Sequence, residues 1–386
     1  MRNILLAIQP FGPRELNLKS MAAVSRQGSL EASIKTEDVD GMLITSLPNI
    51  RYLCGFTGSS GVLAFARGAW RFFTDGRYTE QAKRQVKTAS IQICSHSPRS
   101  EAVQWVAEQL RKKKSPAIGV EAEHVSFLTE KRISSELRSH RGRSGYRIRP
   151  TTSLVEGLRL TKDKAEIVRI RHAVQLSSSV FNNLVRGIRP SVSENDVAAE
   201  LEYLARRAGA EKMSFDTIVA SGPNSALPHA RPTRRRIGSG FVVLDYGVIL
   251  AGYCSDMKRT VWVGRATGEA RQMYSAVLEA QLAAIAAVEP GVECQSVDAA
   301  ARDVLRKHKL DKYFTHSLGH GVGLEIHEAP RLAKAQTQKL EPGMVVTIEP
   351  GVYIPGKGGV RIEDMVLVTK TGCEVLTPTP KEFLVL

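Results

Sequence analysis

Two apolar runs near the end of the chain carry carboxylates where a buried strand has no obvious use for them. Arg361, Glu363 and Asp364 interrupt the run "GGVRIEDMVLV", and Glu349 lies in the preceding run "MVVTIEPGVY". The intervening "IPGKGG" is a Pro/Gly turn signal, so the two runs predict a β-hairpin. A turn centred on Gly356 brings Glu349 opposite Glu363, where like charges repel each other.

Side-chain alternation along a strand assigns these charged residues to faces. Arg361 and Glu363 are two positions apart and share one face, whereas Asp364 lies on the other. The dense β-branched neighbours indicate burial, and a buried pair of like charges is unfavourable by itself. We therefore expect a cation between the carboxylates of Glu349 and Glu363.

A second hairpin, upstream, has the same pattern. In "FVVLDYGVILAGYCSDMKRTVWVG", a turn centred between Leu250 and Ala251 brings Asp245 opposite Asp256. A register slip of one residue would undo either pairing. Each close like-charge pair costs about 4 kcal/mol at an effective dielectric constant of about 20. Four carboxylates in one pocket would therefore raise their pKa values or bind metal.

A glycine-rich stretch supplies imidazoles. "HSLGHGVGLEIHEAP" holds His316, His320 and His327, and its glycines would let the backbone approach a ligand closely. One imidazole with four carboxylates is a mixed N/O set dominated by oxygen. That set suits Mn²⁺ and, less exclusively, Co²⁺, Fe²⁺ or Zn²⁺. Two metal ions bridged by carboxylates would use all five ligands and would support hydrolysis without a protein nucleophile.

Five residues resemble, in their order and context, the metal ligands of the pita-bread metallopeptidases, which include aminopeptidase P, prolidase, methionine aminopeptidase and creatinase. They are Asp245, Asp256, His320, Glu349 and Glu363. The segments "DYG", "SDMKRTVWVG", "GHGVGLEIHEAP", "EPGMVVTIEPGVY" and "GGVRIED" match the family's ligand blocks. "SDMKRT" departs slightly from the family's wording and keeps the carboxylate. "SLPNIRYLCGFTGSSG" and "FFTDGRY" look like the amino-terminal domain of the aminopeptidase P and prolidase branch.

This resemblance implies an α+β protein of two domains: an α/β creatinase-type amino-terminal domain and a pita-bread catalytic domain with pseudo-twofold symmetry. It also implies catalytic roles for three residues. Glu349 would be the base that handles the proton of the attacking water. His229 and His327 would line the substrate cleft and stabilise the tetrahedral intermediate or move protons.

Two further residues are expected on the substrate side. His316, four residues before the expected ligand His320, resembles a substrate-binding histidine of the family. Arg361 would either orient the carboxylate of Glu363 or meet a charge on the substrate.

The implied function is hydrolysis of the amino-terminal Xaa-Pro bond of peptides by a metalloaminopeptidase that holds two divalent metal ions. The wording of "HSLGHGVGLEIHEAP", and the lack of a dedicated cation for a free carboxylate, favour an aminopeptidase over an Xaa-Pro dipeptidase (prolidase), which stays the alternative. The complete ligand set argues against a second alternative, a non-catalytic peptide-binding pita-bread protein. The expected partners are a peptide with proline at its second position and further copies of the chain, in a homodimer or higher homo-oligomer.

Composition places the chain among globular proteins, at 386 residues with 42% hydrophobic and 24% charged residues. No apolar run approaches the roughly 20 residues that span a bilayer, so we expect no membrane contact. Five cysteines without CxxC spacing predict reduced thiols and a cytoplasmic location.

The net charge of +15 is concentrated in the first part of the chain, where residues 1–150 carry 24 Lys and Arg against 13 Asp and Glu. The basic stretches "RKKKS" and "RSHRGRSGYRIR" raise the possibility of nucleic-acid binding. Tyr146 is the only aromatic residue among them, so they lack a stacking platform, and we expect no nucleic-acid partner.

Hydrophobic patterning divides the chain into an extension without regular order at residues 1–20, a first domain at 21–152 and a catalytic domain at 153–386. The runs "GMLIT", "VLAFA", "WRFFT", "IQIC" and "AIGVE" predict strands of the first domain, and residues 149–166 read as a linker. A long amphipathic helix should follow, ending near Gly187. Ser193 and Asp196 predict a capping box at the next helix. Helices are then expected near 268–288 and 295–308.

Overall fold

The computed structural model describes residues 13–140 and 145–386. Within them the chain divides into two compact units, one ending at Arg159 and the other running from Leu160 to Leu386. Of the predicted extension, residues 1–12 lie outside the described residues, and residues 13–20 form the start of helix α1.

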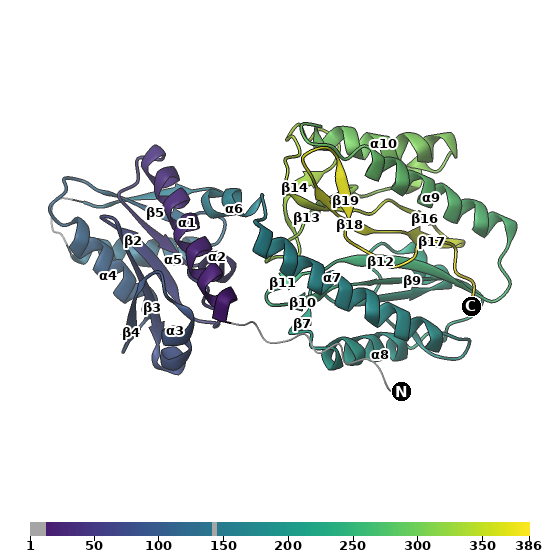
Figure 1. Ribbon diagram of the computed structural model, residues 1–386, viewed down its shortest axis with the longest axis horizontal. Helices are drawn as coiled ribbons and strands as arrows, with labels where there is room; N and C mark the ends of the chain where they lie inside the picture. The colour runs from purple at the N-terminus through teal and green to yellow at the C-terminus, as the bar shows by residue number, and fades with distance from the viewer. Residues whose placement is uncertain (1–12, 141–144) are drawn as a thin grey trace. The chain divides into compact units, whose positions relative to one another are not determined.

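The first unit is a six-stranded mixed sheet with helices packed against it (Figure 1). The strand order is β4-β3-β2-β1-β5-β6, in which β1, β2 and β3 are antiparallel neighbours and the other pairings are parallel. Its elements are α1 (Pro13–Thr36), β1 (Gly41–Ile44), α2 (Leu47–Cys54), β2 (Val62–Ala66), β3 (Ala69–Asp75), η1 (Gly76–Tyr78), α3 (Thr79–Gln85), β4 (Ser90–Cys94), α4 (Pro98–Leu110), β5 (Ala117–Glu121), α5 (Phe127–Ser139), β6 (Arg147–Thr151) and α6 (Leu154–Arg159).

The strand predictions for this unit are confirmed, because all five predicted runs overlap β1 to β5. The sequence did not predict β6, whose residues were read as part of a basic stretch and the linker. Tyr146, just before β6, packs against the core of the unit and donates a hydrogen bond to the Ala107 carbonyl. Its ring is therefore committed to the fold.

The second unit repeats one arrangement, two helices followed by strands. Its first half contains α7 (Lys164–Leu184), η2 (Val185–Gly187), α8 (Glu194–Arg207), β7 (Lys212–Met213), β8 (Ile218–Ser221), η3 (Gly222–Ala226), β9 (Gly240–Tyr246), β10 (Val248–Leu250), β11 (Tyr253–Cys254) and β12 (Met257–Val263). Its second half contains α9 (Gly268–Ala286), α10 (Cys294–Lys307), η4 (Asp311–Tyr313), β13 (Gly319–Gly321), β14 (Glu328–Leu332), β15 (Val345–Ile348), β16 (Gly351–Ile354), β17 (Gly358–Arg361), β18 (Asp364–Val368) and β19 (Cys373–Val375).

Local sequence explains where these helices begin. Ser193 and Asp196 form the predicted capping box of α8. A second capping box, of Asp163 with Glu166, starts α7. The interpretation of residues 149–166 as a linker is therefore wrong, because β6, α6 and the first turn of α7 occupy most of that stretch. Helices α9 and α10 match the predicted ranges within two residues at either end.

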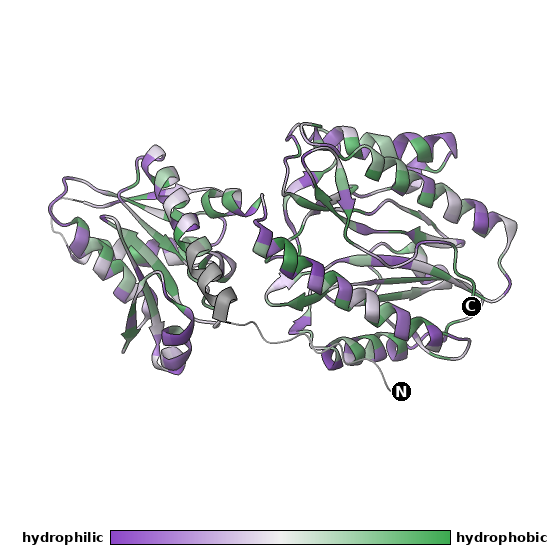
Figure 2. Cartoon of the chain, viewed as in Figure 1, coloured by the Kyte–Doolittle hydropathy of each residue, from purple (hydrophilic) through white to green (hydrophobic). Residues whose placement is uncertain are grey.

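Helices cover the strands of the second unit on both sides (Figure 1). Helices α7 and α8 pack against β8, β9 and β12 in one hydrophobic cluster, and α9 and α10 pack against the strands of the second half in another. Along these helices hydrophilic and hydrophobic residues alternate (Figure 2), as amphipathic helices require when they cover a sheet. Among the described residues, no helix is long and apolar enough to cross a membrane, and all five cysteines are free thiols.

The two predicted hairpins differ in how well their registers were predicted. Gly351 pairs with Arg361 and Ile348 with Asp364, so Glu349 and Glu363 lie opposite each other, as a turn centred on Gly356 predicts. This prediction is confirmed.

In the first hairpin the predicted pairing is wrong, because Asp245 pairs with Lys258 and not with Asp256. Ala251 and Gly252 both have positive φ, 49° and 82°, and form the two-residue turn. Central residues with positive φ are typical of the tight turns that match strand twist. This turn shifts the pairing by two residues, which keeps every side chain on its predicted face.

Arg259 joins the two halves of the second unit. Its buried guanidinium donates to the Asp364 carboxylate and to the backbone carbonyls of Lys258, Glu363, Thr379 and Pro380. Asp364 therefore points away from the face that carries Glu363, as alternation predicts. Strand β12 is thus tied to β18 and to the end of the chain through one side chain.

We predict that Arg259→Ala lowers the free energy of unfolding by about 3–5 kcal/mol, because Asp364 Oδ1 and several backbone carbonyls lose a buried charged donor, although Gln281 and Lys381 still donate to Asp364 Oδ2. Urea unfolding monitored by circular dichroism measures the change. Arg306→Ala, which removes an exposed arginine paired with Asp303, should cost no more than about 1 kcal/mol. Equal losses in the two variants would contradict the linking role of Arg259.

Candidate active site

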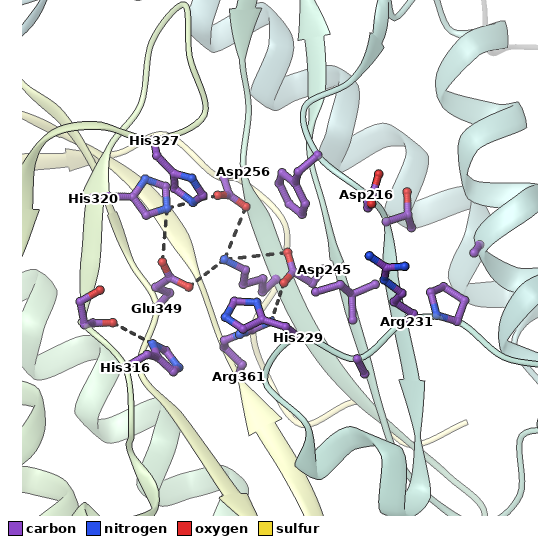
Figure 3. A pocket seen from close by; sticks show the side chains of 18 of the residues that line it. Asp216, His229, Arg231, Asp245, Asp256, His316, His320, His327, Glu349 and Arg361 are labelled. Atoms are coloured by element: carbon purple, nitrogen blue, oxygen red, sulfur yellow. Dashed lines mark hydrogen bonds and ion pairs between the residues drawn. The ribbon is translucent and has the colours of Figure 1, made fainter. Parts of the chain in front are cut away.

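A cavity of about 1050 Å³ opens in the second unit, and its wall combines carboxylates, imidazoles and arginines. All but one of the residues predicted for the site line this cavity: Asp245, Asp256, His229, His316, His320, His327, Glu349 and Arg361. The exception is Glu363. Figure 3 shows that Asp245, Asp256, Glu349 and His320 point toward one another. The prediction that the two hairpins bring their carboxylates together is therefore confirmed for these residues.

Strand ends hold the carboxylates in place. Asp245 lies near the end of β9, between β8 and β12, while Asp256 directly precedes β12. Glu349 follows β15, and Glu363 lies between β17 and β18. All four are buried, with at most 7% of each residue exposed.

His320 lies on β13, and its neighbours set its orientation. The two flanking glycines, Gly319 and Gly321, have no space for a side chain because a Cβ would collide with the carbonyls of Thr347 and Ala329. These glycines therefore serve close strand packing and not close approach to a ligand, which corrects the sequence interpretation. The Nδ1 atom of His320 hydrogen-bonds the Gly321 carbonyl at 3.0 Å, which leaves Nε2 free to bind a ligand.

Three of the predicted metal ligands form a compact group. Ligand atoms of Asp256, His320 and Glu363 all lie within 4.8 Å of one another, which is close enough to hold one ion. The His320 Nε2 atom lies 3.6 Å from Asp256 Oδ2 and 3.4 Å from Glu349 Oε1. Glu349 thus borders this group through the same imidazole nitrogen.

Lys258, which lies among the carboxylates, is not predicted by the sequence analysis. Its Nζ atom lies 2.7 Å from Glu349, 3.2 Å from Glu363, 3.7 Å from Asp256 and 3.8 Å from Asp245. The predicted cation between Glu349 and Glu363 is therefore supplied, at least in part, by the chain itself. A signal was available, since Lys258 is two residues after Asp256 and strand alternation places both on one face.

Arg361 also differs from its expected role. Its Nη2 atom pairs with Asp245, and among the described residues it forms no ion pair with Glu363. Of the two roles predicted for Arg361, orienting Glu363 is therefore not supported, and contact with a charge on the substrate stays a prediction. Because the side chain is 3% exposed and already paired, Arg361 belongs to the charge network beneath the cavity.

The pKa values of the carboxylates show an incomplete charge balance. Burial raises the pKa of Asp245 to about 6, although Lys258 and Arg361 oppose the shift. Burial, with Asp256 as the next cause, raises the pKa of Glu363 well above its usual value. Burial also disfavours the ionised form of Glu349, but Lys258 at 2.7 Å lowers its pKa to about 2.

Three buried carboxylate oxygens lack a hydrogen-bond donor. Asp245 Oδ1, Asp256 Oδ1 and Glu363 Oε2 are shielded from solvent and accept no hydrogen bond from any described residue, although the Lys258 ammonium lies 3.8, 3.7 and 3.2 Å from them. Such atoms are costly unless a cation reaches them. Together with the free Nε2 of His320, they have the chemistry of a site for a divalent metal ion.

The other histidines occupy different surroundings. His316 hydrogen-bonds the Ser317 carbonyl through Nδ1 and the Tyr353 hydroxyl through Nε2, at 2.8 and 2.9 Å. The ring of His327 lies edge-on to that of His320, with 4.4 Å between centroids. His229 lines the cavity and is exposed to solvent.

Further lining residues were not predicted from the sequence. Arg231 and Arg331 are exposed, and neither forms an ion pair within residues 13–140 and 145–386. Phe215, Ile218 and Pro232 add an apolar part to the wall. No short motif marks these residues, because the loops that carry them come together only in the folded chain.

Carboxylates that the internal cations do not fully neutralise, beside an imidazole with a free Nε2, are the ligand set of a metal-dependent hydrolase. The cavity above them has room for a peptide. Fold and site together define this class of protein.

Comparison with known proteins identifies the family. Residues 168–370 match metallopeptidase family M24, and residues 26–161 match the creatinase/prolidase N-terminal domain. The chain therefore belongs to metallopeptidase family M24, and it is a peptide hydrolase with a creatinase-type first domain and a pita-bread second domain. The predicted resemblance and the predicted α+β fold are confirmed.

Relatives match along nearly the whole chain. The uncharacterized peptidase YqhT of Bacillus subtilis is 40% identical over 349 residues, which cover 90% of this chain and 96% of that protein. An Xaa-Pro dipeptidase structure from Bacillus anthracis has 40% identity and a TM-score of 0.88, covering 94% of this chain and 100% of its own. An X-Pro aminopeptidase structure from Thermotoga maritima MSB8 has 34% identity and a TM-score of 0.82, covering 90% and 98%.

We predict that His316 makes the metal-free protein less stable in acid. Burial of the ring lowers its pKa from 6.5 to about 4, although the Glu349 carboxylate and the hydrogen bond to the Ser317 carbonyl oppose the shift. Since the unfolded chain binds the proton more readily, this contribution is complete above pH 6.5 and is lost as the pH falls toward 4.

Melting temperatures of wild type and His316→Gln, measured from pH 7 to pH 4 in chelator, test this. The fall of the wild-type melting temperature through that window should be smaller in the variant. The exposed His308→Gln serves as the control and should follow the wild type. Parallel curves for wild type and His316→Gln would exclude the proposed role of His316.

Proposed function

We propose that the protein hydrolyses the amino-terminal Xaa-Pro bond of peptides as a metal-dependent Xaa-Pro aminopeptidase. The observation that carries the proposal is the set of buried, incompletely neutralised carboxylates beside the free Nε2 of His320, at the floor of a cavity of about 1050 Å³. Relatives named Xaa-Pro dipeptidase and X-Pro aminopeptidase support specificity for proline.

The residues that would hold a divalent ion are Asp245, Asp256, His320, Glu349 and Glu363. The oxygen-rich donor set favours Mn²⁺. When bound, a divalent ion lowers the pKa of a water molecule and polarises a carbonyl. The sequence predicts two ions, and that number stays a prediction. Lys258 bears on it because its ammonium lies among the same carboxylates.

The chain's own residues would handle the protons. Glu349 is kept ionised by Lys258 and faces His320, so its carboxylate can accept a proton from the attacking water. The proline nitrogen needs a proton as it leaves, and His229 and His327 border the cavity where that nitrogen would lie. His316 is held neutral and fixed by Tyr353, which suits it to contact the substrate.

Proline fits the shape of the wall as well as the chemistry. An Xaa-Pro bond offers no N–H, so an enzyme cannot hold the substrate through a hydrogen bond from that group. Phe215, Ile218 and Pro232 offer an apolar surface to the pyrrolidine ring. We expect these side chains to recognise the ring, and the carboxylate cluster to act on the preceding carbonyl.

A dipeptidase is the second candidate, and a specific observation favours it. Arg231 and Arg331 line the cavity without a carboxylate partner among the described residues, so either could bind the free carboxylate of a dipeptide. In Figure 3, Arg231 lies on the Asp216 side of the pocket, away from His320. The cavity volume, at the upper end of the about 300–1,000 Å³ typical of ligand pockets, favours longer peptides.

Location and assembly complete the proposal. Five free thiols support a cytoplasmic protein. A homodimer or higher homo-oligomer stays a prediction from the family resemblance.

We predict that Asp256→Asn lowers kcat/KM for Xaa-Pro peptides by more than about 100-fold, because it removes a ligand charge beside His320. Metal content after Mn²⁺ loading should fall with it, while the circular dichroism spectrum stays that of the wild type. Asp303→Asn makes the same change at an exposed position of α10 and should keep full activity. Unchanged turnover and metal content in Asp256→Asn would refute the assignment.

Substrate length decides between the two candidates. We expect kcat/KM for Xaa-Pro-Xaa-Xaa to exceed that for Xaa-Pro, and a preference of about tenfold for the dipeptide, about 1.4 kcal/mol, would favour prolidase instead. Arg231→Ala and Arg331→Ala extend the test. If one of them serves as a carboxylate clamp, its loss should weaken dipeptide hydrolysis and spare the tetrapeptide.

A further inference from the structure

Lys258 occupies the centre of the carboxylate cluster. On β12, Lys258 pairs with Asp245 of β9, and it also forms an isolated β-bridge with Glu363. Its backbone is therefore fixed between the two hairpins. The side chain is 8% exposed and its Nζ atom lies within 4 Å of all four carboxylates. The ammonium therefore occupies space that a metal ion shared by those carboxylates would need.

The charges around Lys258 fit one divalent ion better than two. Four carboxylates face the ammonium of Lys258 and the guanidinium of Arg361, which leaves two negative charges. One divalent ion brings this group to neutrality. Two divalent ions would leave it with two positive charges in a buried site.

The unsatisfied atoms indicate where that ion lies. Asp245 is already paired by Arg361 and faced by Lys258. Asp256 Oδ1 and Glu363 Oε2 also face the Lys258 ammonium, at 3.7 and 3.2 Å, but they accept no hydrogen bond from a described residue, although 2% or less of each residue is exposed. His320 turns its free Nε2 toward the same place, and the three side chains offer ligand atoms within 4.8 Å of one another.

We propose that Lys258 takes the place of a second metal ion, so that the site holds one divalent ion, bound by Asp256, His320 and Glu363. In this arrangement Lys258 is a positioning residue, since it neutralises Asp245 and keeps Glu349 ionised and oriented beside the ion. The inference rests on the metal dependence in the proposed function and replaces the two-ion site expected from the sequence.

Metal stoichiometry tests the inference without reference to activity. Purified full-length protein is stripped with chelator, titrated with Mn²⁺ by calorimetry, and analysed for metal after desalting. Wild type should bind one Mn²⁺ per chain. Lys258→Thr, which removes the ammonium and keeps a β-branched residue in the strand, should bind two. Lys357→Thr removes an exposed lysine and should bind one.

Electron paramagnetic resonance gives a second readout. At saturation the wild type should show the hyperfine-split signal of isolated Mn²⁺, and Lys258→Thr the signal of two coupled ions. Two ions bound by the wild type would overturn the inference and leave the proposed function intact. No binding at millimolar Mn²⁺ would overturn both. If folded Lys258→Thr binds one ion, Lys258 is not the reason why a second ion is absent. If that variant does not fold, the stoichiometry of the wild type decides the question.

Discussion

Compensation of buried negative charge is the constraint on which the second unit depends. Four carboxylates are buried close together. Like charges at close range repel each other by several kcal/mol unless cations lie among them. Lys258 and Arg361 supply part of the compensation on the cavity side. Arg259 supplies it on the far side, where it pairs with Asp364. Strand β12 carries two of these three cations, so it belongs to the core and to the site alike.

The fold concentrates the charges through strand geometry. Residues two positions apart share a face, so Asp256 and Lys258 turn toward the pocket together, and Arg361 shares its face with Glu363, which is buried without lining the cavity. The helices α7 to α10 cover the outer faces with apolar side chains, which leaves the inner face for polar groups. The polar groups of the site and the apolar core therefore lie on opposite faces of the strands.

Much of this could be predicted from the sequence, because period-two alternation and turn chemistry are local. The Gly at the centre of the second hairpin predicts its register correctly, and the faces of Glu349 and Glu363 follow from it. The first hairpin was placed two residues out of register, since nothing local indicates that Ala251 would adopt a positive φ. The resulting error exchanged Asp256 for Lys258 opposite Asp245 while leaving both on the correct face.

What the sequence did not reveal depends on contacts between distant segments. Arg361 was assigned to Glu363, its neighbour on the strand, whereas in the folded chain the Asp245 carboxylate from the other half is its partner. A lone lysine on a strand usually extends to solvent, and only the junction of the two hairpins surrounds Lys258 with carboxylates. Arg231 and Arg331 likewise meet the cavity through loops whose positions no short motif specifies.

The most direct measurement is a crystal structure of the Mn²⁺-loaded wild-type protein, with anomalous diffraction data at the manganese edge. One anomalous peak between Asp256, His320 and Glu363, with the Lys258 ammonium still against Glu349, is the predicted result. Two peaks bridged by the carboxylates, with the lysine side chain displaced from the cluster, would contradict the claim that an internal cation completes this site.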